Sequence, residues 1–172
     1  MSIPLSQHLD VAHLAIGIVK FSPSPALTTG SEERATEAMR LVRKSFRKAK
    51  CGVDHQFDHI QITQNGLPSD EFGEICSAVE RKLEKLRLKP LSSRAVEEIL
   101  SISSGERRRW SKDGRLPHVG NALIKLGKKQ LSLFLYSPVD VQVILRNPDT
   151  VLRWRQEDIA HAGPSIPSVS AT

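Results

Sequence analysis

Hydrophobic residues in the first half of the chain recur every three or four positions, which is the spacing of an amphipathic helix. The first such stretch runs from Leu5 to Phe21 and predicts a helix that is either buried or in contact with a partner. Its apolar positions are Leu5, Leu9, Ala12, Ile16 and Val19. A run of Ser, Pro, Thr and Gly over residues 22–30 then predicts a break between helices.

A second helix is predicted to begin near Ser31, with Thr29 and Glu32 at the spacing of a capping box. Its apolar residues step by four, three, four and three, and basic residues take most of the other faces. The apolar residues are Ala35, Met39, Val42, Phe46 and Ala49. This seam is narrower than the apolar face of a helix in a monomeric core, so it predicts homo-oligomerisation through residues 31–88. Contact of residues 1–88 with another protein is the alternative.

Alternation with period two over residues 58–63 predicts a short strand, and Asn65-Gly66 predicts a turn after it. A third helix is predicted from Ser69 to about Leu88, shortly before Pro90. The segment 88–91 therefore divides the chain into an amino-terminal helical region, residues 1–89, and a carboxy-terminal module, residues 90–160. Residues 161–172 are predicted to form a disordered tail.

After Pro90 the predicted elements are short and closely spaced. Ser92 or Ser93 caps one short helix, and Ser103 with Glu106 forms the capping box of a second, which ends at residues 113–114. Residues 121–126 and 130–136 predict two strands joined by a turn at 127–129, and further helices begin after residues 137 and 147. The predicted fold class is mostly α with a small β-hairpin wing, a helical region followed by a winged helix-turn-helix.

Positive charge is concentrated in one segment of the chain. Residues 104–129 contain eight basic residues and only two acidic ones, Glu106 and Asp113. This segment therefore carries the whole net charge of +6. The rest of the chain balances at seventeen side chains of each sign. Such an excess in one segment favours a polyanionic partner.

Composition narrows the class of protein further. A chain of 172 residues with 39% hydrophobic and 26% charged residues is of ordinary globular composition. No stretch approaches the roughly 18 apolar residues that a spanning helix needs, and the start lacks a basic leader, so no membrane contact is expected. The two cysteines are expected to be free thiols in a reducing compartment. These features predict a cytoplasmic protein associated with the bacterial nucleoid.

The run from Val96 to Pro117 resembles the winged helix-turn-helix of the MerR-like and excisionase-like proteins. Ile102-Ser103 is similar to the turn of that family, Trp110 to the aromatic that ends its second helix, and residues 114–117 (Gly-Arg-Leu-Pro) to the lead into its wing. The resemblance covers about residues 91–145. It is moderately specific, because the aromatic, the glycine and the proline recur at fixed offsets.

The chain departs from this family at Glu106 and Arg107, where the family has a threonine and an apolar residue. The resemblance implies binding of double-stranded DNA, as a dimer or in a cooperative array, and a role in transcription or in directing site-specific recombination. Nothing in the first 88 residues resembles the effector-binding parts of MerR regulators.

The second helix of such a unit enters the major groove, where the planar fork of arginine suits guanine edges and phosphates. Lysines at the tip of the hairpin neutralise phosphates and release counterions. The predicted DNA-binding residues are Ser104, Arg107, Arg108, Arg109, Lys112, Arg115, His118, Lys125, Lys128 and Lys129. The three consecutive arginines cannot share one groove, and Arg108 or Arg109 with Lys112 is better placed for the bases than Arg107. Trp110 is predicted to be a core residue that locks the second helix to the wing.

Sites for metals or catalysis have little support in the sequence. Cys51, His55 and His59 are spaced by four, as zinc ligands on a helix would be, but Gly52 and the strand pattern that follows argue against a continuous helix. Asp54 and Asp58 beside the two histidines allow a nuclease cluster only if the fold brings them together. No phosphate-binding glycine loop or nucleophile elbow is present, so we expect no enzyme, no cofactor and no metal.

The sequence therefore predicts a sequence-specific, dimeric DNA-binding protein that regulates transcription. A recombination directionality or excision accessory protein is the near alternative, because it would use the same chemistry on a different site. The alternative from another class is an interaction protein that acts through its amino-terminal helices and binds nucleic acid only loosely.

Overall fold

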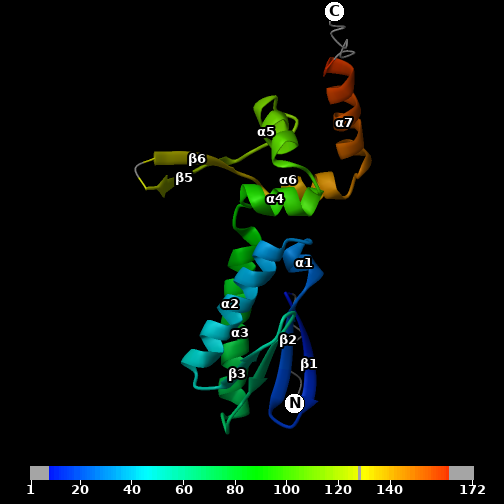
Figure 1. The fold of residues 1–172 in the computed structure, drawn as a ribbon. Coiled ribbons are helices and arrows are strands. Elements are labelled where there is room, and N and C mark those ends of the chain that lie inside the picture. The colour runs from blue at the N-terminus through cyan, green and yellow to red at the C-terminus, as the bar shows by residue number, and fades with distance from the viewer. Residues whose placement is uncertain (1–7, 128, 163–172) are drawn as a thin grey trace, which may run out of the picture.

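The computed structural model describes residues 8–127 and 129–162, and it contradicts the predicted fold class. The chain is mixed α/β, with 53% helix and 22% strand, and its amino-terminal half contains a four-stranded antiparallel sheet where only helices with one short strand were expected. Figure 1 shows this sheet and its helices as one unit, and the shorter helices and the hairpin as a second unit. Within the described residues, no helix is long and apolar enough to cross a membrane.

Residues 5–7 of the helix predicted over residues 5–21 lie outside the described residues, and the rest of that stretch is instead a β-hairpin. Strand β1 (Leu9–Ala15) pairs with strand β2 (Ile18–Pro23), and Gly17, at φ +73°, takes the left-handed conformation that closes the turn. Val19 and Phe21 point into the core at period two and pair with Ile62 and Ile60 of a strand forty residues away. Of the residues at helical spacing, Leu9 and Val19 are buried in the hairpin, whereas Ala12 and Ile16 are exposed, so the distant pairing overrides the helical pattern.

The sheet has the order β1-β2-β4-β3. Strand β4 (Ile60–Thr63) confirms the strand predicted over residues 58–63, whereas strand β3 (Gly52–His55) was not predicted. The run over residues 22–30, predicted as a break, contains the short helix α1 (Pro25–Thr28), whose first turn is capped by Ser24. Thr29 ends α1 in the left-handed conformation, so the cap of the next helix is Ser31 rather than Thr29.

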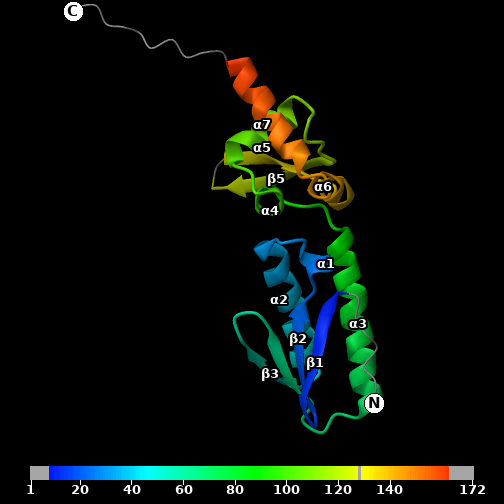
Figure 2. The same cartoon turned by 90° about the vertical axis from the view of Figure 1, so that its right-hand side faces the viewer.

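The two long predicted helices are confirmed as α2 (Glu32–Lys48) and α3 (Ser69–Leu88). They pack beside each other against one face of the sheet, where alternate residues of β2 and β4 are buried (Figure 2). Met39, Val42 and Phe46 of the narrow seam lie in this core, with Phe46 between Phe21 and Phe72. The seam is therefore satisfied within one chain, and its width gives no reason to expect self-association.

The carboxy-terminal unit follows the predicted order of elements. It contains α4 (Ser93–Leu100), α5 (Ser104–Lys112), β5 (Gly120–Leu126), β6 (Lys129–Leu135), α6 (Pro138–Leu145) and α7 (Asp149–Ala162). Leu91 pairs with Tyr136 as an isolated bridge, which ties the start of this unit to the end of the hairpin. A second core forms around Trp110, Tyr136 and Leu116, and it shares no residue with the core under the sheet.

Polar contacts join the two units. The Glu98 carboxylate of α4 accepts hydrogen bonds from the Ser31 hydroxyl at 2.9 Å and the Glu33 N–H at 3.4 Å, so it lies at the amino terminus of α2. Buried Arg34 donates to the carbonyl oxygens of Arg87 at 3.3 Å and Lys89 at 2.7 Å, where α3 ends. These contacts fix the direction in which the chain leaves the first unit.

Candidate nucleic-acid interface

Helix α5 is held by a local cap and by the helix that follows the hairpin. The Ser103 hydroxyl accepts the Glu106 N–H at 3.2 Å, and the Glu106 carboxylate accepts the Ser103 N–H at 2.7 Å, which confirms the predicted capping box. The same carboxylate accepts from Arg155 of α7 at 2.7 Å. This hydrogen bond from Arg155, together with those from Ser103, lowers the pKa of Glu106 to about 2. The amino-terminal turn of α5 is therefore fixed against α7.

Trp110 is fully buried, as predicted, but its main aromatic contact is with α7 and not with the wing. Its ring meets the Trp154 ring edge-on at 5.0 Å between centroids. Its indole N–H donates to the Asp158 carboxylate at 3.0 Å. The aromatic residue that ends α5 therefore anchors the back of the helix and is not exposed to a ligand.

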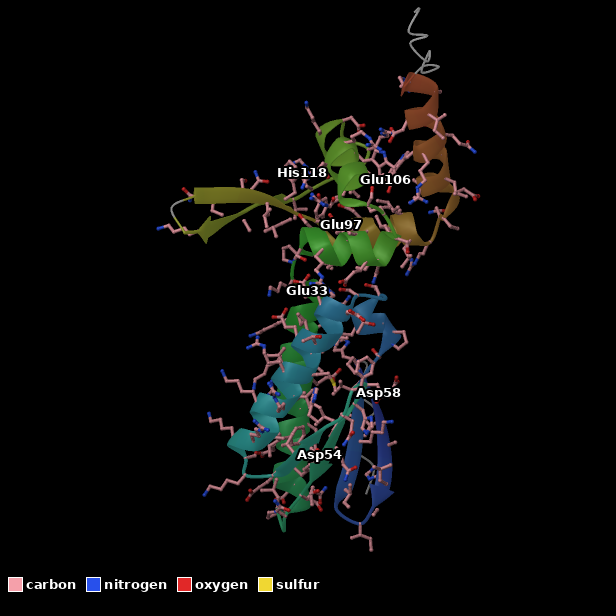
Figure 3. All side chains as sticks on the ribbon, viewed as in Figure 1. Glu33, Asp54, Asp58, Glu97, Glu106 and His118 are labelled. Carbon is pink, nitrogen blue, oxygen red and sulfur yellow. The ribbon has the colours of Figure 1, made fainter. Side chains whose placement is uncertain are left out.

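Arg107 was predicted to contact DNA, but it is buried in the structure. Only 6% of the residue is exposed, its Nε donates to Glu97 of α4 at 2.6 Å, and its Nη1 donates to the Tyr136 hydroxyl at 3.1 Å. The Tyr136 hydroxyl in turn lies 2.8 Å from the Ser111 hydroxyl. Figure 3 shows Glu97 on α4 below α5, on the inner side of this helix. A guanidinium held in this way joins α4, α5 and the end of the hairpin, so it cannot reach a base edge.

Arg109 and Arg115 are partly neutralised by one carboxylate of α7. Asp158 accepts from Arg109 at 2.9 Å and from Arg115 at 2.6 Å, and these hydrogen bonds, led by that from Arg115, lower the pKa of Asp158 to about 2. Arg115 also donates to Asp113 at 2.6 Å and to Glu157 at 3.3 Å. The high local charge of the sequence is therefore reduced in the fold by acids 42 to 49 residues away.

Three candidates remain on the outer face of α5. Ser104, Arg108 and Lys112 are exposed, and their spacing of four residues places them in one row along the helix. None of these three side chains has a hydrogen bond or ion pair within the described part of the chain. A row that begins with a hydroxyl and continues with two free cations can donate hydrogen bonds to phosphates and to the acceptor atoms of guanine.

The hairpin supplies the remaining candidates. In its register Lys125 faces Gln130 and is exposed, near the tip of the ribbon. His118 is exposed before β5, and its ring lies 4.3 Å from that of Phe134, so it is held against the base of the hairpin. Lys128 lies outside the described residues, as does the side chain of Lys129, although Lys129 begins β6.

The residues considered for metal binding or catalysis do not form a site. Cys51 is buried, whereas His55, Asp54 and Asp58 are exposed on β3 and the loop after it, in the sheet unit (Figure 3). The His59 ring lies 2.6 Å from the neighbouring Asp58 carboxylate. No group of three or more His, Cys, Asp or Glu in residues 8–127 and 129–162 is arranged to hold a metal ion.

The sequence analysis did not identify the acidic residues that pair with arginines and so determine which arginines remain unpaired. Glu97, Glu157 and Asp158 lie ten to forty-nine residues from the arginines they bind. Only the spacing of Glu97 and Arg107, on adjacent short helices, offered a local signal.

Comparison of the chain with family models, with curated proteins and with solved structures finds no match.

Proposed function

We propose that this chain is a sequence-specific binding protein for double-stranded DNA that regulates transcription. One observation carries the proposal: the row Ser104, Arg108 and Lys112 is exposed and unpaired in the described structure, on a helix braced from behind by buried Arg107 and Trp110. An α-helix fits the width of the major groove, and a braced helix presents its outer side chains in a fixed geometry. The hairpin beside it would contact the phosphate backbone.

The order helix, turn, helix, hairpin, helix supports this proposal, because it is the order of a winged helix-turn-helix. Within that arrangement Arg108 and Lys112 would meet bases or phosphates, and Lys125, Lys128 and Lys129 would hold the backbone. Arg107 is left out of the proposed contacts because it is buried. One inserted helix reads too few base pairs for a specific site, so the proposal includes two copies on two half-sites. An excision accessory protein would use the same contacts on a different target.

Selection of bound fragments from a random DNA pool, followed by binding titrations, tests the proposal. The double variant Arg108→Ala, Lys112→Ala is expected to reduce the ratio of specific to non-specific affinity, since each lost base contact costs about 1 to 3 kcal/mol on the preferred site. The matched control is Arg146→Ala, Arg153→Ala, which removes two exposed cations, one directly after α6 and one in α7. Failure of the selection to enrich any sequence, or equal losses in both variants, would reject sequence-specific binding by α5.

A further inference from the structure

A second group of cations lies on helix α2, outside the segment that carries the net charge. Residues 38–53 contain no acidic residue, and they contain six basic ones. These are Arg40, Arg43, Lys44, Arg47, Lys48 and Lys50. Outside residues 104–129 the numbers of basic and acidic side chains are equal, so the net charge does not reveal this group. The acidic residues that balance it lie outside residues 38–53. Three of them, Glu32, Glu33 and Glu37, are in the first half of the same helix.

The cations of α2 face away from the core. The buried residues Met39, Val42 and Phe46 hold one side of the helix against the sheet and α3, while Arg40, Lys44 and Arg47 follow at i, i+4 and i+7 on the exposed side. We call Arg40, Lys44, Arg47 and Lys48 the α2 basic stripe. Of its members, only Arg40 has an ion pair within the described residues, a distant one to Glu37 at 3.8 Å.

The helix dipole accounts for only part of this arrangement. Cations near a helix carboxy terminus are stabilised by the dipole within the last turn, which on α2 contains Arg47 and Lys48. Arg40 and Lys44 lie one to two turns earlier, where the dipole contributes little. Repulsion among unpaired cations on consecutive turns destabilises a helix slightly, so a bound polyanion would relieve it.

Some exposed side chains of α2 extend towards the same side of the view as the β5–β6 hairpin. Figure 3 shows nitrogen-tipped side chains extending from α2 towards the left of the view, and the β5–β6 hairpin extends to the left above them. Lys82 of α3, whose Nζ donates to Ser45 of α2 at 2.8 Å, adds an exposed cation beside the stripe. The cations of α2 and Lys125 of the hairpin therefore belong to elements that extend towards the same side of the view.

We propose that the α2 basic stripe binds the phosphate backbone of the duplex that α5 contacts, beyond the footprint of α5 itself. This inference rests on the proposed function. At a rise of 1.5 Å per residue the stripe begins roughly 14 Å and ends roughly 26 Å from Ser31, where Glu98 of α4 contacts α2. The stripe is therefore about 12 Å long, which corresponds to about three to four base pairs of duplex. Exposed lysines and arginines without base contacts add affinity that does not depend on sequence.

The test uses the full chain and two duplexes of random sequence, one of about 6 base pairs closed by a loop and one of about 40 base pairs, because only the longer one extends past a single inserted helix. The stripe variant is Lys44→Gln, Arg47→Gln, Lys48→Gln. The control variant is Lys20→Gln, Arg146→Gln, Arg153→Gln. It removes the same charge from β2, from the residue directly after α6, and from α7. Binding is titrated by fluorescence anisotropy at several salt concentrations.

On the long duplex the stripe variant is expected to bind at least about tenfold more weakly than the wild type, with a salt dependence shallower by about two to three units of slope. On the short duplex it is expected to match the control. Stripe and control variants with the same loss on both duplexes, or a stripe variant equal to the wild type on the long duplex, would overturn the inference. The proposed function stands independently if Arg108→Ala, Lys112→Ala still reduces the ratio of specific to non-specific affinity on the selected site, and it fails if the wild type binds neither duplex. Circular dichroism and the melting temperature of each variant confirm that it is folded.

Discussion

Arg107 and Arg108 are neighbours in sequence and have opposite surroundings. Arg107 is bound to Glu97 and Tyr136 in the interior, while Arg108 is exposed on the other side of α5. The run of three arginines is therefore not one surface. One member holds the module together, one is shared with Asp158, and one is available to a ligand.

Arg107→Ala is expected to lower the free energy of unfolding by about 2 to 3 kcal/mol, because it leaves Glu97 and the Tyr136 hydroxyl without their buried partner. Arg108→Ala is the matched control and is expected to change stability by no more than about 0.5 kcal/mol, while it weakens DNA binding. Urea unfolding and DNA titrations of both variants make the comparison. If Arg108→Ala is the more destabilising of the two, the assignment of the inner and outer faces of α5 is wrong.

Asp158 gives the module a defined response to acid. Hydrogen bonds from Arg115, Arg109 and Trp110 lower its pKa to about 2, below the ordinary value of 3.8. A carboxylate whose pKa is lower in the folded state contributes stability above its ordinary pKa, and this contribution is lost as the pH falls towards the folded-state value. Asp158→Asn is therefore expected to reduce stability at neutral pH and to flatten the fall in stability between about pH 4 and pH 2.

Unfolding of the full chain by urea at several pH values measures this effect. Glu74→Gln, which removes an exposed carboxylate from α3, is the control and is expected to leave the pH dependence close to that of the wild type. An Asp158→Asn variant with the same acid response as the wild type would show that the three donors do not depend on this carboxylate.

At the scale of elements, the contact between α5 and α7 determines whether the module keeps its shape. Trp110→Ala is expected to destabilise the carboxy-terminal unit by about 3 to 5 kcal/mol, because it removes a fully buried ring from its contact with Trp154. Loss of DNA binding would follow from loss of structure. Near-ultraviolet circular dichroism during thermal unfolding follows the tryptophan environment directly. A variant that keeps its melting temperature and loses only DNA affinity would contradict the structural role of Trp110.

The hairpin is expected to contribute affinity without discrimination. Lys128→Ala with Lys129→Ala should weaken binding to all duplexes alike and make the salt dependence shallower by about one to two units of slope, since each neutralised phosphate releases about one counterion. The ratio of specific to non-specific affinity should stay nearly constant. Titrations on a selected site and on scrambled DNA measure both quantities. A change in that ratio would show that the hairpin reads sequence.

Local signals predicted the elements whose structure is decided locally. The Ser103–Glu106 capping box, the end of α5 near Gly114 and the long helices α2 and α3 are set by neighbouring residues, and all are confirmed. The β1–β2 hairpin was missed because Leu9, Ala12, Ile16 and Val19 happen to fit helical spacing, whereas pairing of β2 with β4 decides the structure. Strand β3 was missed because its four residues include exposed Asp54 and His55. The pairing of arginines with acids was missed because the acidic partners come from elements that are distant in the sequence.

At the scale of the whole molecule, two hydrophobic cores are connected by polar contacts. The seam of α2 is narrow because α3 and the sheet cover it together, and no second copy is needed to bury it. Homo-oligomerisation remains part of the proposed function through the need for two half-sites, and it requires a surface other than the seam. Sedimentation of the full chain with and without DNA measures it.

The separation of the two cores predicts two unfolding transitions in one chain. Val42 belongs to the core of the sheet unit and Val96 to the core of the carboxy-terminal unit, and both are fully buried. Val42→Ala and Val96→Ala are each expected to cost about 2 kcal/mol, and each should affect only its own unit because no apolar residue is shared.

For units of this size a loss of 2 kcal/mol lowers the melting temperature by about 8 to 16 °C, so differential scanning calorimetry of the full-length variants can separate the transitions. Val42→Ala should move one transition and Val96→Ala the other. A single transition that both variants lower equally would mean that the contacts of Glu98 and Arg34 couple the units into one cooperative structure. In that case the direction of the carboxy-terminal unit relative to the α2 basic stripe would be fixed by folding itself. With two separate transitions, only the polar contacts at Ser31 and Lys89 would fix the direction of the carboxy-terminal unit relative to the stripe.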